Sequence, residues 1–246
     1  PIFYLNYYYD SYSHGISFND VYQSLLSDYH RHKPSQNIDP SFFTEFDNIR
    51  DKIAMKLIHY ERNKELLEKV PHIRFLDLAI VFYCLIAMDF ATGNATILIH
   101  HSHLKNWNIT TTELFQIAKD NTQKILPEKL YDMNDVLYEL SGRLTHPDPT
   151  VSRPSPYPMF VLTNETNLFG AACLLYKDLL KHFSEKSQTD FYILPSSIHE
   201  VILVPTLEND CYGELSDMVR EVNDSQLMDD EILSTHAYYY SRRKNE

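Results

Sequence analysis

"DFYILPSSIHEVILVP", residues 190–205, places two runs of aromatic and branched apolar residues on either side of a Pro-Ser-Ser sequence. Aromatic and β-branched residues favour strands, whereas Pro and Ser are typical of turns. We therefore predict strands over Asp190–Leu194 and Ile198–Val204, joined at Pro195–Ser197. This hairpin is the centre around which the rest of the sheet is expected to form.

The same stretch contains a candidate catalytic site made of Ser197, His199 and Glu200. Ser197 and His199 would share one side of the strand, and a serine activated by histidine is the start of nucleophilic catalysis. His199 and Glu200 would point to opposite faces, because side chains alternate along a strand. No GxSxG sequence surrounds the serine. Two structural interpretations compete with catalysis, an ordinary turn and a Ser197–Glu200 capping box, and we favour the turn.

Helix and strand signals alternate along the rest of the chain. Ser17 and Asp20 predict an N-cap for a helix over Phe18–His32, and the Thr110–Glu113 spacing predicts a capping box for a helix that ends at Pro127. Further strands are expected in residues 74–88, 95–101, 159–163 and 236–241, and further helices after residue 41 and in residues 63–70, 132–140, 170–183 and 214–223. The order lacks βαβ regularity. We therefore predict an α+β fold with a mixed or largely antiparallel sheet and several flanking helices.

One proline-rich segment divides the chain. Residues 146–158 contain five prolines and are predicted to form an extended surface loop. Residues 1–145 are expected to supply the N-terminal helices and the first part of the sheet. Residues 159–246 are expected to form a second α+β subregion that completes the same domain.

Charge and cysteine content exclude several classes of protein. The net charge is −12, and residues 206–232 hold nine acidic residues against one arginine. Direct nucleic-acid binding is therefore disfavoured, because such a chain repels phosphate backbones. The three cysteines form no CxxC pair, the longest apolar run is interrupted by Asp77 and Asp89, and no signal-like segment opens the chain. These features favour a cytoplasmic protein without a membrane span.

Histidines at positions 100, 101 and 103 raise the question of a metal site. If this segment is a strand, only His101 and His103 share a face, so further ligands must come from elsewhere. The pair is a candidate metal site, but surface or core histidines explain it better. No cofactor is expected.

Several blocks of the sequence resemble a known family. They include "NKELLEKVPHIRFLDLAIVF", "VLTNETNLFGAACLLYKDLL", "DFYILPSSIHEVILVP" and "LSTHAYYY". Together they are similar to an uncharacterised bacterial family, domain of unknown function 5688, over most of the chain. The resemblance implies no activity and no catalytic residues.

Two hypotheses for the function follow from the sequence. The first is a non-catalytic protein-interaction module, whose acidic, Tyr-rich surface meets a partner with a basic surface. The second is a serine or metal-dependent hydrolase that uses the Pro195–Glu200 segment. We favour the first, because no complete catalytic constellation is visible in the sequence. The sequence does not determine the oligomeric state.

Overall fold

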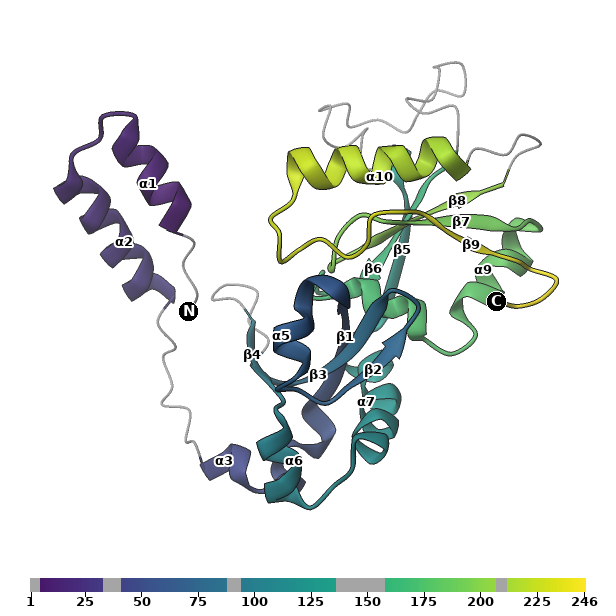
Figure 1. Ribbon diagram of the computed structural model, residues 1–246, viewed down its shortest axis with the longest axis horizontal. Helices are drawn as coiled ribbons and strands as arrows, with labels where there is room; N and C mark the ends of the chain where they lie inside the picture. Colours follow the sequence, from purple (N-terminus) through teal and green to yellow (C-terminus); the bar gives the residue numbers. More distant parts are fainter. Residues whose placement is uncertain (1–4, 33–40, 88–93, 136–157, 207–211) are drawn as a thin grey trace.

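A computed structural model describes residues 5–32, 41–87, 94–135, 158–206 and 212–246 (Figure 1). These residues form an α+β fold with two sheets, and every strand pair in the described ranges is antiparallel. The predicted fold class is confirmed. The Pro-rich segment 146–158 lies outside the described residues except for Pro158, so the predicted division of the chain stays a prediction.

The first sheet is built around β3 (Leu78–Ala87). One side of β3 pairs with β1 (Ile53–His59), and the other side pairs with β2 (His72–Phe75) and β4 (Ala95–Leu98). The prediction of a single strand over residues 74–88 was wrong, because Leu76 and Asp77 form a two-residue turn between β2 and β3. Leu76 has a φ of 55° there, although Gly and Asn are the usual residues at such positions.

The second sheet has the order β5-β6-β8-β7-β9. Its strands are β5 (Glu128–Asp132), β6 (Phe160–Asn164), β7 (Phe191–Pro195), β8 (Val201–Pro205) and β9 (Tyr238–Tyr240). All five residues of β7 are buried, because alternate side chains enter different clusters. Phe191 and Ile193 pack into the main core, whereas Tyr192 and Leu194 face helix α10 (Tyr212–Gln226).

A single main core joins the two sheets and two helices. Ile53, Met55 and Leu57 of β1 belong to the same buried cluster as Leu162 and Leu203 of the second sheet. Helices α6 (His101–Trp107) and α7 (Thr111–Ile125) complete this cluster. The predicted capping box of α7 is confirmed by its hydrogen bonds: the Thr110 N–H donates to Glu113 Oε2 at 2.8 Å, and the Glu113 N–H donates to Thr110 Oγ1 at 3.2 Å.

Seven further helical elements are described between residues 41 and 187. They are α3 (Ser41–Thr44), α4 (Phe46–Ile49), η1 (Arg50–Lys52), η2 (Glu61–Asn63), α5 (Lys64–Leu67), η3 (Gly170–Leu175) and α9 (Leu179–Ser187). All have six residues or fewer except α9, which has nine. The single helix predicted over residues 170–183 is therefore two elements. Asp178, with a φ of 58°, separates η3 from α9, because a left-handed residue cannot continue a right-handed helix. The helix predicted over residues 132–140 lies largely outside the described residues.

A hydrogen-bonded clamp at Asp77 ties the C-terminal segment to the first sheet. Asp77 Oδ2 accepts from the Ser234 hydroxyl at 2.8 Å, and Asp77 Oδ1 accepts from the Tyr238 hydroxyl at 2.6 Å. Ser234 is fully buried, and its carbonyl oxygen accepts from Asn223 Nδ2 of α10 at 2.8 Å. The unusual turn at Leu76 therefore places a carboxylate where two buried or half-buried hydroxyls need an acceptor.

Helices α1 (Leu5–Ser13) and α2 (Phe18–His32) form a hairpin beside the rest of the molecule (Figure 1). The predicted bounds of α2 are confirmed, and Ser17 caps it by accepting from the Asp20 N–H at 3.2 Å. Helix α1 was not predicted from the sequence. The Tyr8 hydroxyl joins the two helices by donating to Asp28 Oδ2 at 2.8 Å. No residue from 5 to 30 is buried.

Candidate functional site

The Pro-Ser-Ser segment forms a loop, and the strand that follows it begins later than predicted. Residues 196–200 connect β7 to β8, so the prediction of a strand from Ile198 was wrong. The Ile198 N–H donates to the Glu231 carbonyl oxygen at 3.0 Å, and the Ile198 carbonyl oxygen accepts from the Ala171 N–H at 3.3 Å. Because Ile198 uses its backbone groups on two other segments, it cannot pair with β7.

Ser197 and Glu200 make the hydrogen bonds of a turn. The Ser197 N–H donates to the Glu200 carbonyl oxygen at 3.1 Å, and Ser197 Oγ accepts from the His199 N–H at 3.0 Å. The Glu200 carboxylate accepts from the hydroxyl of Ser196 at 3.4 Å. The bonds correspond to a side-chain to backbone turn and not to a capping box. Catalysis by Ser197, His199 and Glu200 remains a prediction that these contacts do not favour.

The His199 ring faces the loop before η3 and not Ser197. The ring stacks on Phe169 with 5.4 Å between centroids, and its Nδ1 accepts from the Phe169 N–H at 3.2 Å. Lys56 of β1 lies against the same phenyl ring, with its Nζ 4.1 Å from the centroid. Burial lowers the pKa of Lys56 to about 8, and Asp230 partly opposes this shift. Phe169 therefore contacts both a histidine ring and a desolvated amine.

The candidate metal residues His101 and His103 lie in a helix. The expected strand ends at Leu98 as β4, and α6 begins at His101, so the prediction that the two side chains share a strand face was wrong. His103 Nδ1 accepts from the His100 N–H at 3.0 Å, and the His103 ring packs against Phe43 and Trp107. Burial lowers the pKa of His103, and the nearby His100 adds to this effect.

No group of three or more His, Cys, Asp or Glu side chains that could hold a metal ion occurs among the residues described. None of the helices in the described ranges is both long enough and apolar enough to cross a membrane.

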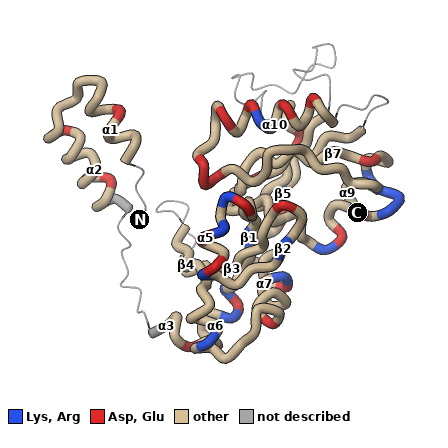
Figure 2. Tube along the Cα trace, in the orientation of Figure 1, with Lys and Arg blue, Asp and Glu red and all other residues tan. Residues whose placement is uncertain are grey.

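Acidic residues recur along α10 (Figure 2), and their side chains are exposed. Leu215 and Val219 are buried against the second sheet, whereas Glu214, Asp217 and Glu221 are exposed. Arg220 Nη2 donates to Asp217 Oδ1, which neutralises part of this charge. The helix is an ordinary amphipathic element whose acidic side faces solvent.

The α1–α2 hairpin carries the largest group of exposed apolar side chains. Thirteen large hydrophobic side chains are exposed in the described ranges, and eight of them lie in this hairpin. Tyr12, Phe18 and Tyr22 are 51%, 71% and 46% exposed and form a continuous row. Tyr12 meets Phe18 edge to face at 6.4 Å, and Phe18 stacks on Tyr22 at 6.3 Å. We call Tyr12, Phe18 and Tyr22 the aromatic row.

The charge of the hairpin is uniformly negative apart from its C-terminal end. Residues 5–30 include Asp10, Asp20 and Asp28 but no Lys or Arg, and they also hold six of the 18 tyrosines of the chain. This surface was not predicted from the sequence. The signal that could have found it is the spacing of Leu5, Tyr9 and Tyr12, which recurs every three or four residues as on one face of a helix.

Comparison with known proteins gives one match. A family model described as "Family of unknown function (DUF5688)" matches residues 1–242. No curated protein and no solved structure matches the chain significantly.

Proposed function

Since the chain belongs to the family of unknown function DUF5688, whose description assigns no activity, we propose a function from its own surfaces: it is a protein-interaction module. The α1–α2 hairpin is the binding element, and its occupant is a protein that presents basic side chains around an apolar groove. We place this interaction in the bacterial cytoplasm, in keeping with the cysteine content of the sequence.

The observation that carries this proposal is that no residue from 5 to 30 is buried, although the hairpin is rich in large apolar side chains. Short helices are marginally stable in water by themselves, and in proteins most of their stability comes from packing of an apolar face. Exposed apolar patches on soluble proteins commonly mark binding surfaces. The aromatic row is therefore suited to enter a groove on a partner.

Charge selects the kind of partner. The hairpin contains three aspartates, and residues 5–30 contain no Lys or Arg to offset them. A basic partner would be attracted by this surface and an acidic partner repelled, which affects both the association rate and the choice of partner. A second copy of this chain fits less well, because two such hairpins would bring like charges together.

Photo-crosslinking in cells tests the proposal. We would place a photoreactive amino acid at Phe18 and, as a matched control, at Leu130, an exposed apolar residue of β5. We expect a discrete adduct with one basic protein from position 18 and none from position 130. Tyr12→Ala should then weaken binding of the purified partner by about tenfold or more, as expected for an aromatic anchor residue. An adduct only with a second copy, or none, would contradict the proposal.

The alternative hydrolase function has its own test. If Ser197 acts only in the turn, a serine-directed fluorophosphonate will not label it, and Ser197→Ala will lower the free energy of unfolding by roughly 0.5–1.5 kcal/mol. Labelling of Ser197 that is abolished by His199→Ala would instead identify an activated nucleophile.

A further inference from the structure

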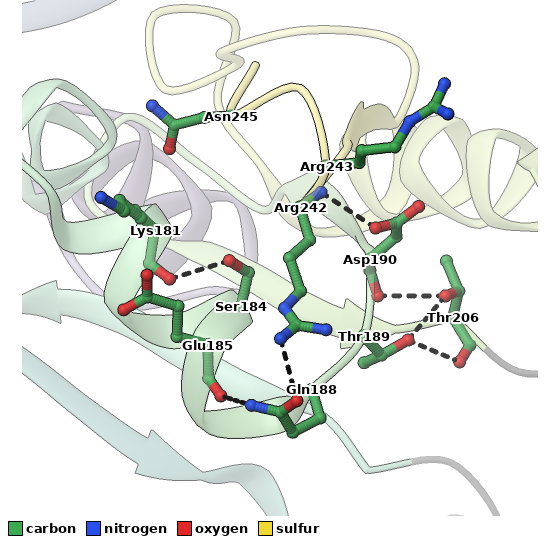
Figure 3. Close-up of a pocket in the computed structure, with 10 residues that line it drawn as sticks. All are labelled: Lys181, Ser184, Glu185, Gln188, Thr189, Asp190, Thr206, Arg242, Arg243 and Asn245. Atoms are coloured by element: carbon green, nitrogen blue, oxygen red, sulfur yellow. Dashed lines mark hydrogen bonds between the residues drawn. The ribbon is translucent and has the colours of Figure 1, made fainter.

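A pocket of about 630 Å³ lies between α9, the start of β7 and the C-terminal turn (Figure 3). Three cationic side chains line it, Lys181, Arg242 and Arg243, together with two carboxylates, Glu185 and Asp190. The pocket is therefore net positive in a chain whose net charge is −12. Its volume lies in the range of sites that bind small molecules.

Arg242 is held in place by a neutral side chain. Its guanidinium reaches the C-terminal end of α9, where Nη2 donates to Gln188 Oε1 at 2.9 Å (Figure 3). Gln188 Nε2 donates in turn to the Glu185 carbonyl oxygen, which fixes the orientation of the amide. Because Gln188 carries no charge, it positions the guanidinium without neutralising it.

Gln188 ends α9 in a left-handed backbone conformation, as the last residue of many helices does. Its φ is 58°, in the left-handed region where residues other than Gly and Asn are infrequent. The end of α9 therefore places the Gln188 amide beside the Arg242 guanidinium.

Asp190, one of the two carboxylates of the pocket, already has hydrogen-bond partners. Asp190 Oδ2 accepts from the Tyr239 hydroxyl, and Asp190 Oδ1 accepts from the backbone N–H of Arg242 at 2.9 Å. These two hydrogen bonds, that of Tyr239 first, lower the pKa of Asp190, and the nearby charges of Arg242 and Arg243 lower it further. Within the described ranges, no ion pair joins Lys181, Arg242 or Arg243 to a carboxylate.

We propose that this pocket binds a small phosphorylated molecule, with its phosphate group on Arg242. A planar guanidinium can donate two parallel hydrogen bonds to phosphate oxygens. Lys181 lies on the α9 side and adds a second positive charge, whereas Arg243 points outward at the rim and contributes only to the local field (Figure 3). Asn245 Oδ1 accepts from the Tyr240 hydroxyl at 2.6 Å, which leaves the amide N–H groups as further donors.

The remaining features limit the ligand to a small one. Glu185 lines the same pocket, and its negative charge disfavours polyanions such as a nucleic-acid backbone. The cavity is much larger than one phosphate ion, so its unfilled part can hold the organic portion of a phosphate monoester. This inference does not depend on the α1–α2 hairpin or on its partner.

Calorimetry with the full chain tests the proposal. Inorganic phosphate and glycerol 3-phosphate would be titrated at constant ionic strength against the wild type, Arg242→Gln, Arg242→Lys and a control, Arg220→Gln on the exposed face of α10. We expect saturable binding of both ligands, with the monoester tighter. Arg242→Gln should raise the Kd by about tenfold or more. Arg242→Lys should raise it by less, because the ammonium retains the charge but cannot donate the two parallel hydrogen bonds of a guanidinium. Arg220→Gln should leave the Kd unchanged.

Three results would overturn the proposal: absence of saturable binding to the wild type, an unchanged Kd in Arg242→Gln, or equal loss of affinity in Arg220→Gln. If Arg242→Gln does not fold, as judged by circular dichroism, Gln188→Ala replaces it. That variant keeps the charge of Arg242 and removes its orientation, so a several-fold rise in Kd supports the proposal and an unchanged Kd contradicts it.

Discussion

Replacement of Asp77 by Ala tests whether the clamp between the C-terminal segment and the first sheet stabilises the fold. The change removes two hydrogen bonds to a charged acceptor, one from the fully buried Ser234 hydroxyl and one from Tyr238. Hydrogen bonds to charged groups contribute roughly 1.5–3 kcal/mol each. Because Asp77 is half-buried, water replaces part of the loss, and we expect the free energy of unfolding to fall by about 3 kcal/mol.

Urea unfolding followed by circular dichroism measures this change, provided that the slope of the transition is similar in both proteins. Asp120→Asn is the matched control, because Asp120 is exposed on α7 and no hydrogen bond or ion pair joins its side chain to another described residue. In a double-mutant cycle, Tyr238→Phe should lose most of its effect in the Asp77→Ala background. A loss below about 1 kcal/mol for Asp77→Ala, or full additivity, would show that the clamp is not a stabilising unit.

Three further predictions concern single positions. Gly170→Ala should lower the free energy of unfolding by about 3 kcal/mol in urea unfolding, because a methyl group there would collide with Thr163 Oγ1 and a backbone carbonyl oxygen. Lys56→Met should raise the free energy of unfolding at pH 7 by up to about 3 kcal/mol, because burial lowers the pKa of this amine from 10.5 to about 8. In the wild type, stability should therefore rise between pH 8 and 10.5, and denaturation across that range should show no such rise for the variant. The lowered pKa of His103 means that the unfolded chain binds more protons below pH 6.5, so stability should fall as the pH drops below that value. His103→Gln, which can still accept from the His100 N–H, should reduce this slope in the same denaturation series.

Local signals in the sequence predicted those elements whose ends are set by local chemistry. Ser17 and the Thr110–Glu113 pair cap α2 and α7, so both helices begin where the sequence indicates. The turn at Leu76 was missed, because neither Gly nor Asn marks it and the flanking residues are apolar on both sides. The start of β8 was predicted three residues early, because long-range backbone bonds of Ile198 override its strand propensity.

The candidate sites were harder to predict, because they depend on contacts between distant segments. The pocket brings together Lys181, Gln188 and Arg242, and no local pattern in the sequence around Arg242 indicates that these residues share a site. Helix α6 begins at His101, and in its first turn the His100 N–H donates to the His103 side chain. Histidine is not a common capping residue, so the sequence did not indicate this helix. The aromatic row was missed for a different reason: amphipathic spacing normally indicates a side that faces the core, and here that side is not covered.

The clamp at Asp77 also has a consequence for the order of folding. Asp77 is separated along the chain from Ser234 by 157 residues and from Tyr238 by 161 residues. During synthesis, the β2–β3 turn emerges long before either hydroxyl exists, and closing so long a loop has an entropic cost that local pairing does not. We expect the clamp to form after the rate-limiting step, so that breaking it speeds unfolding and leaves the refolding rate nearly unchanged. The strand pairs near residue 77 would then be in place before the C-terminal segment is attached to them.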